Sequence, residues 1–158
     1  MPVIVFASSK GGAGKTTACV ILAAELARQG KDKGIDISLI DADEAARTIN
    51  LIRRQEKALQ RKISYSVLFT RTNPALIPRT LKAIMGDFKK VGIDIFRCSL
   101  TDREAFRAVR SFGGTVNDLS PQEVSGIEKA VINAKEYAEE VKRKLKDSIE
   151  EVRRSANG

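Results

Sequence analysis

The stretch of sequence that decides the fold covers residues 3–17 and reads VIVFASSKGGAGKTT. Its first five residues form a continuous apolar run, which is typical of a strand buried on both faces of a parallel sheet. From Lys15 onward the apolar residues recur at intervals of three and four, which predicts a helix that ends near Gly30. The sequence therefore predicts a strand, a glycine-rich loop and a helix in direct succession.

The loop at residues 10–16 has the composition that phosphate binding requires. Small residues let successive backbone N–H groups turn toward phosphate oxygens without a Cβ in the way. The following helix adds its positive dipole end, Lys15 adds a charge for the β- and γ-phosphates, and the hydroxyl of Thr16 can ligate magnesium. The residues expected to contact a nucleotide are Gly11, Gly12, Ala13, Gly14, Lys15, Thr16 and Thr17.

A glycine-rich turn without a ligand is the alternative interpretation of this loop. The order of strand, loop and helix favours a P-loop that binds a nucleoside triphosphate, and ATP with Mg²⁺ is the expected ligand. This pattern is the most specific signal in the sequence.

The composition limits the kinds of protein to which this loop can belong. The chain has 158 residues, enough for one domain, and its hydrophobic share of 42% is ordinary for a folded protein. Histidine is absent, which excludes histidine-based catalysis, and Cys19 and Cys98 are expected to be reduced thiols. We find no signal peptide and no membrane-spanning run, so we expect a cytoplasmic protein without a membrane partner. A net charge of +8 favours anionic partners, but charge alone leaves nucleic acid and anionic lipid open.

Strands and helices alternate along the rest of the chain. Further strands are predicted at residues 35–40, 65–70 and 94–98, and helices at residues 44–62 and 78–90. Thr101 and Ser120 each begin a capping-box pattern that predicts a helix start. The alternation predicts a three-layer α/β fold of the P-loop type with a small parallel sheet, and ligands at the carboxyl ends of its strands. We expect residues 1–158 to form a single nucleotide-binding domain.

Two carboxylates, Asp41 and Asp43, directly follow the strand predicted at residues 35–40. Carboxylates at this edge of a sheet can hold water around magnesium or orient an attacking water. Asp43 also precedes the helix predicted from Glu44, where an aspartate can serve as N-cap. Both roles are open for Asp43, and they are compatible.

The last predicted helix is long and carries one narrow apolar seam beneath a charged surface. The seam residues are Ile127, Val131, Ala134, Ala138, Val141, Leu145, Ile149 and Val152. Four basic residues of this helix, Lys142, Arg143, Lys144 and Lys146, are the best candidates for contacting DNA phosphates. A solvated face with internal ion pairs is the alternative. The end of the helix is expected to project or to pair.

The loop sequence Lys-Gly-Gly-Ala-Gly-Lys-Thr-Thr resembles the deviant Walker A motif of the ParA/MinD family of partition and positioning ATPases. Ser9 stands where the usual motif begins with glycine, and an early lysine, Lys10, follows it. The resemblance implies that Lys10 reaches the phosphates across an ATP-dependent homodimer; a solvated loop lysine is the alternative. It also implies that Asp43 orients the lytic water and that Asp41 holds the water shell of the metal. Lys10, Lys15 and Asp43 are thus the expected catalytic residues.

The resemblance covers two blocks, residues 1–43 and residues 44 to about 140, and a stretch between them is missing. In the family that stretch contains the Walker B-like strand, whose terminal aspartate supports magnesium, and the switch II loop. A sheet of about four strands in the order 2-1-3-4 would close the gap and keep right-handed crossovers. The loss puts ATP hydrolysis in more doubt than ATP binding.

The leading hypothesis is a ParA-like plasmid or chromosome partition ATPase that binds ATP, hydrolyses it weakly, dimerises on ATP and binds DNA without sequence preference. A partition partner protein is implied by the resemblance. The first alternative is a non-catalytic or engineered minimal nucleotide-binding module, which the missing strand favours. The second is a MinD-like membrane-positioning ATPase, against which the acidic residues on the terminal helix argue.

Overall fold

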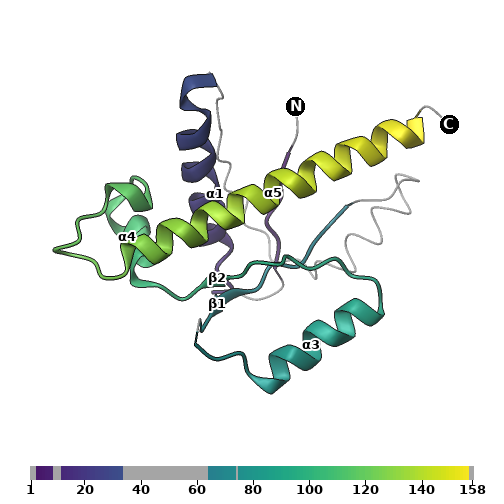
Figure 1. The fold of residues 1–158 in the computed structure, drawn as a ribbon, viewed down its shortest axis with the longest axis horizontal. Helices are drawn as coiled ribbons and strands as arrows, with labels where there is room; N and C mark the ends of the chain where they lie inside the picture. The colour runs from purple at the N-terminus through teal and green to yellow at the C-terminus, as the bar shows by residue number, and fades with distance from the viewer. Residues whose placement is uncertain (1–2, 9–11, 34–63, 74, 157–158) are drawn as a thin grey trace.

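The computed structural model describes residues 3–8, 12–33, 64–73 and 75–156. Its helices are α1 (Lys15–Gly30), α3 (Arg79–Lys90), α4 (Glu104–Phe112) and α5 (Ile127–Ala156), with short 3-10 helices η1 (Lys31–Lys33) and η2 (Val116–Asp118). The strands are β1 (Thr70–Thr72) and β2 (Leu100–Thr101). In Figure 1 the long α5 lies across α1 and reaches α4, while α3 is set apart beyond the strands. The predicted α/β class, with a small parallel sheet and a long C-terminal helix, is confirmed.

The sheet joins the two segments that the sequence predicts as its last two strands. The paired positions are Val67 with Ile95, Thr70 with Leu100, and Thr72 with Thr101, all parallel. The chain passes from β1 to β2 through α3, as a parallel pair requires. Thr70 and Thr72 face adjacent residues of β2, so Arg71 is the extra residue of a β-bulge.

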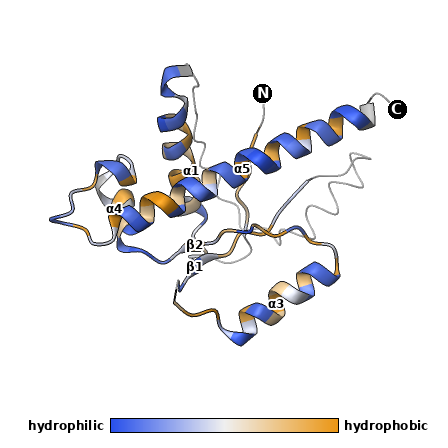
Figure 2. Ribbon diagram, viewed as in Figure 1, coloured by the Kyte–Doolittle hydropathy of each residue, from blue (hydrophilic) through white to orange (hydrophobic). Residues whose placement is uncertain are grey.

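The hydrophobic core lies between α1, α4 and the first half of α5. Its buried helical residues include Ala18, Ile21 and Leu22 of α1, Phe106 and Val109 of α4, and Ala130, Ala134, Tyr137 and Ala138 of α5. The small alanines of α5 allow the neighbouring helices to approach closely, and the Tyr137 ring lies 5.9 Å from the Phe96 ring beside the sheet. Figure 2 shows apolar residues along α1 and the first half of α5.

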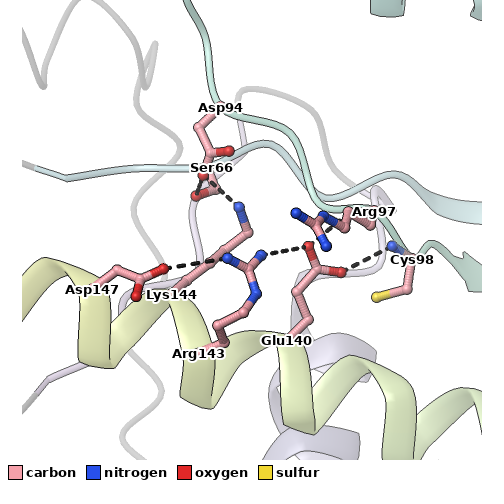
Figure 3. A network of polar contacts seen from close by, with 8 residues as sticks. All are labelled: Ser66, Asp94, Arg97, Cys98, Glu140, Arg143, Lys144 and Asp147. Atoms are coloured by element: carbon pink, nitrogen blue, oxygen red, sulfur yellow. Dashed lines mark hydrogen bonds and ion pairs between the residues drawn. The ribbon is translucent and has the colours of Figure 1, made fainter.

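Two polar side chains of α5 complete the hydrogen bonding of the backbone at and before β2. The buried Glu140 accepts hydrogen bonds from the N–H groups of Arg97 and Cys98 at 2.7 and 2.9 Å (Figure 3). Asn133, two turns earlier, accepts from the N–H of Thr101 at 3.1 Å. Buried backbone groups must find partners, and here helix side chains supply what a neighbouring strand supplies in a wider sheet.

The second half of α5 extends beyond the core (Figure 1). Val141 is still buried, Leu145 is half-buried, and Ile149 and Val152 are exposed. The predicted seam is therefore covered only over its first part, and the prediction that the helix end projects is confirmed. None of the described helices, α5 included, has the length and apolarity needed to cross a membrane.

The strand expected at residues 3–7 is not formed in the described part of the chain. Residues 3–8 have no strand pairing, and Val3 and Val5 are 73% and 81% exposed. A strand needs at least one hydrogen-bonded neighbour, and neither β1 nor β2 pairs with this segment. Of the expected order 2-1-3-4, the described residues contain only the adjacent final pair. The strand predicted at residues 35–40 and the helix at residues 44–62 lie outside the described residues.

The helices predicted at the start of the chain, at residues 78–90 and at the C-terminus are present as α1, α3 and α5, but both predicted capping boxes are wrong. Thr101 lies in β2, because its backbone pairs with β1 instead of starting a helix. Ser120 begins a turn several residues before α5. The capping box that does form lies at η2, between Thr115 and Asp118. At Thr101, strand pairing therefore prevails over the helix start that the capping-box pattern predicts.

Candidate nucleotide-binding site

The loop that leads into α1 has a backbone shape that only glycine adopts without strain. Gly14 is the N-cap of α1 with φ 83° and ψ 14°, and Gly12 has φ 71°. Both values lie in the left-handed region, which residues with a Cβ rarely enter. The helix begins immediately afterwards, since the N–H of Ala18 donates to the carbonyl of Gly14 at 2.9 Å.

The first turn of α1 is open to an anion. Gly14 offers no capping side chain, α1 has no side-chain cap within the described part of the chain, and its first turn contains no acidic residue. The N–H groups at the start of the helix, and the dipole that they terminate, favour a negative group there. Lys15 is half-buried and Thr16 is exposed in this turn. These donors, an ammonium group and a hydroxyl fit a magnesium-bound triphosphate.

Thr70, at the start of β1, holds the loop against the sheet. Its hydroxyl donates to the carbonyl of Ala13 at 2.6 Å. A Cβ added to Gly14 would lie 3.1 Å from the Thr70 Oγ1 and 3.3 Å from the Thr70 Cβ. Glycine at position 14 is therefore required twice, by its φ angle and by the close approach of the strand.

Arg71 brings a further cation to the same loop. It is the bulge residue of β1, and among the described residues it is the only non-glycine residue with a positive φ, 56°. Bulges near functional sites redirect side chains, and here the Arg71 Nη1 donates to the carbonyl of Gly12 at 3.3 Å. A left-handed arginine costs about 1 kcal/mol or more, so the surrounding structure must impose this conformation.

Neither Thr70 nor Arg71 is among the site residues predicted from the sequence. Their one signal is their position at the carboxyl end of a predicted strand, the edge at which ligands bind in parallel sheets. Other predicted strands also end in polar residues, so this signal does not single them out. The contacts with Gly12 and Ala13 do.

Several predicted site residues lie outside the described residues, namely Lys10, Gly11, Asp41 and Asp43. The described ones, Gly12, Ala13, Gly14, Lys15, Thr16 and Thr17, form one continuous turn that enters α1. Of the two predicted metal-binding residues, only Thr16 is described.

Lys144, one of the predicted DNA-contacting residues, is packed into the protein. Its ammonium pairs with Asp94 (Figure 3). The same ammonium lies 4.9 Å from the centroid of the Phe96 ring. Its side chain is only 14% exposed. Burial raises the pKa of Asp94, but the hydrogen bonds from Lys144 and Ser66 outweigh burial, and the net shift is downward.

The other three predicted DNA-contacting residues pair with carboxylates of α5 itself. The pairs are Lys142 with Glu139, Arg143 with Glu140 and Asp147, and Lys146 with Glu150. Lys142 also donates to Gln29 of α1 at 2.7 Å. These pairs are the internal ion pairs that the alternative interpretation expects, and DNA contact by these residues stays a prediction.

Comparison with known proteins agrees with the geometry of the loop. Residues 4–157 match the family described as CobQ/CobB/MinD/ParA nucleotide binding domain. Protein ParA of Rhizobium radiobacter is 24% identical over 222 residues, a match that covers 94% of this chain and 100% of the relative. Because this alignment is longer than the chain, the relative contains a substantial stretch with no counterpart here.

Proposed function

The chain belongs to the CobQ/CobB/MinD/ParA nucleotide-binding domain family, and we propose that it binds ATP with Mg²⁺ at the loop before α1. The observation that carries the proposal is the open first turn of α1, capped by a left-handed Gly14 and fixed to the sheet by Thr70. The family alone would leave the binding competence of this short chain undecided. The preserved shape of the loop supports it.

Each residue of the loop has a proposed task. Gly12, Ala13 and Gly14 direct backbone N–H groups to the phosphates, Lys15 contacts the β- and γ-phosphates, and Thr16 ligates Mg²⁺. Gly11, Thr17 and Asp41 complete the set, with Asp41 holding water of the metal shell. Arg71 adds a positive charge at Gly12 and steadies the loop. Bound Mg²⁺ would neutralise charge on the phosphates.

For catalysis we propose slow ATP hydrolysis in which Asp43 orients the water. The stretch of the ParA relative that has no counterpart in this chain supports slow turnover, while the loop geometry does not depend on it. The same observation favours a second candidate function, a nucleotide-binding module without catalysis. The two differ in one measurable property, turnover at saturating MgATP.

We further propose that the protein acts in the cytoplasm as a ParA-like partition protein, with Lys10 contacting the phosphates across an ATP-dependent homodimer and a partition protein as partner. Its DNA binding would be electrostatic and independent of sequence, in keeping with a net charge of +8. The ion pairs along α5 reduce the charge that Lys142, Arg143, Lys144 and Lys146 can offer to phosphates. We therefore expect low affinity with a shallow salt dependence if α5 is the contact surface.

Calorimetry with MgATP tests the central proposal. Lys15→Ala should weaken binding by about tenfold to a hundredfold, because charge-assisted hydrogen bonds contribute about 1.5–3 kcal/mol. Lys31→Ala, which removes an exposed lysine at the other end of α1, is the matched control and should bind as wild type does. Equal affinity of the folded Lys15→Ala variant and wild type would contradict a nucleotide site at this loop.

Turnover and self-association are measured on the same samples. Asp43→Ala should lower the rate of ATP hydrolysis with little change in affinity, and no detectable turnover in wild type would favour the non-catalytic module. Lys10→Ala should reduce dimerisation with a non-hydrolysable ATP analogue more than it reduces binding. A wild type that remains monomeric at saturating analogue would exclude the dimer.

A further inference from the structure

A cleft of about 430 Å³ opens between α3, α5 and the paired segments of the sheet. Its apolar lining includes Phe69, Leu81, Met85, Phe96 and Ile132. We call it the α3–α5 cleft. None of the loop residues 12–17 lines it, so it is separate from the proposed nucleotide site in the described part of the chain.

The apolar side chains at this cleft are uncovered. Leu76, in the segment before α3, is 65% exposed, and Ile132 of α5 is 57% exposed. All residues of α3 are described and none is buried, although the helix is clearly amphipathic. Clustered exposed apolar side chains are typical of interaction sites, and grooves between helices are a common seat for amphipathic segments.

Three cations line the same cleft without an ion pair. The charged groups of the Arg97, Arg103 and Lys129 side chains form no salt bridge among the described residues, in contrast to the paired basic residues later in α5. The Nε of Arg103 is buried and has no hydrogen-bond partner in the described part of the chain. Among the described residues that line the cleft, Glu136 is the one with an acidic side chain. A buried donor without a partner is costly, so a carboxylate that entered the cleft would gain bonds now unmade.

From these observations we propose that the α3–α5 cleft binds an amphipathic, acidic segment of a partner protein. Leucine-like side chains of that segment would enter between Leu81, Met85 and Ile132, and its Asp or Glu side chains would meet Arg103 and Lys129. Charge complementarity favours this occupant over the cleft of a second copy, because an acidic segment complements Arg97, Arg103 and Lys129, whereas a second cleft brings the same three cations. The apolar lining does not suit nucleic-acid phosphates.

Selection from a displayed library of random 12-residue peptides tests the proposal without presupposing the partner. The full chain is the target, and fluorescence anisotropy then measures the affinity of recovered peptides. We expect peptides in which Asp or Glu accompanies Leu, Ile or Phe. Arg103→Gln with Lys129→Gln should weaken their binding by about tenfold or more, and Ile132→Ser, at an exposed position, should weaken it too.

The matched control removes the same charge elsewhere. Lys31→Gln with Arg153→Gln, both at exposed positions outside the cleft, should leave peptide affinity unchanged. Failure to recover peptides, recovery without acidic residues, or equal binding by the cleft variant and wild type would overturn the proposal. Self-association of the wild type that Ile132→Ser abolishes would show that a second copy occupies the cleft, and would overturn it as well. MgATP calorimetry on the cleft variant reports the nucleotide site separately, so each proposal can fail alone.

Discussion

α5 and α3 are both amphipathic helices beside the same strand pair, yet only α5 is incorporated into the core. Tyr137 of α5 is 1% exposed, and Glu140 bonds the backbone before β2. All residues of α3 are described, none is buried, and its main aromatic contact is the stacking of Phe88 on Phe69, with centroids 6.4 Å apart. An amphipathic pattern thus predicts a helix and its inner face, but not whether another element covers that face.

The two helices differ in the elements against which they pack. α5 packs on α1 and α4, which bring apolar residues of their own, so burial removes apolar surface from water on both partners. α3 borders the open α3–α5 cleft instead. We therefore expect stability to depend strongly on α5 and weakly on α3, and the following measurements test this comparison.

The largest effect is expected for truncation of the buried aromatic residue of α5. Tyr137→Ala should lower the free energy of unfolding by about 3–5 kcal/mol, because it leaves a cavity between α1 and the sheet. Phe88→Ala is the matched change in α3 and should cost about 1 kcal/mol, since its site is already partly open. Urea unfolding followed by circular dichroism measures both, and similar losses would contradict the comparison.

Loss of the carboxylate that bonds the backbone before β2 should have the next largest effect. Glu140→Gln exchanges one acceptor oxygen for an amide group that cannot accept from both Arg97 and Cys98. We expect a loss of about 1–3 kcal/mol. The control on α3 is Asp87→Asn, which removes a surface pair with Lys90 and should cost less than about 0.5 kcal/mol. Equal costs would mean that Glu140 acts only as a surface charge.

The pH dependence of stability also tests whether the Glu140 carboxylate stabilises the fold. Burial raises the pKa of Glu140, but hydrogen bonds from the N–H groups of Arg97 and Cys98 outweigh it, and the net pKa lies below 4.5. A carboxyl group with a lowered folded-state pKa stabilises the fold above its unfolded pKa and loses this contribution as pH falls through the folded value. Wild type should therefore lose stability below about pH 4.5, and Glu140→Gln should lose less over that range. Parallel curves from urea midpoints at several pH values would rule out this role for Glu140.

The smallest expected effect separates two lysines on the basic stretch of α5. Lys144→Met should cost about 1 kcal/mol, because it removes the contact with the Phe96 ring and the pair with Asp94. Lys146→Met, whose native side chain is 76% exposed, should change stability by less than about 0.3 kcal/mol. If thermal unfolding shows the reverse order, the packed position of Lys144 does not contribute to the fold.

At the nucleotide site too, features set by neighbouring residues could be predicted, and contacts between distant residues could not. The glycine-rich loop, the start of α1 at Lys15 and the resemblance to the ParA/MinD family could all be predicted from the sequence, and the family match confirms the last. Thr70 and Arg71 could not, because their contacts join residues more than fifty positions apart in the chain. The roles of Lys10, Asp41 and Asp43 stay predictions.

The sequence by itself determined what depends on near neighbours in the chain: the left-handed turn of glycines into α1 and the period of the long C-terminal helix. Only the tertiary structure decided what depends on partners. Residues 3–7 are strand-like in composition but form no strand, because neither β1 nor β2 pairs with them in the described part of the chain. The sequence predicts Lys144 as an exposed charge. In the structure it packs on Phe96 and pairs with Asp94, two residues that are distant from it in the chain. The spacing of apolar residues along a helix depends on residues close together in the chain. Burial, strand pairing and ion pairing depend on contact with a segment that is distant in the sequence.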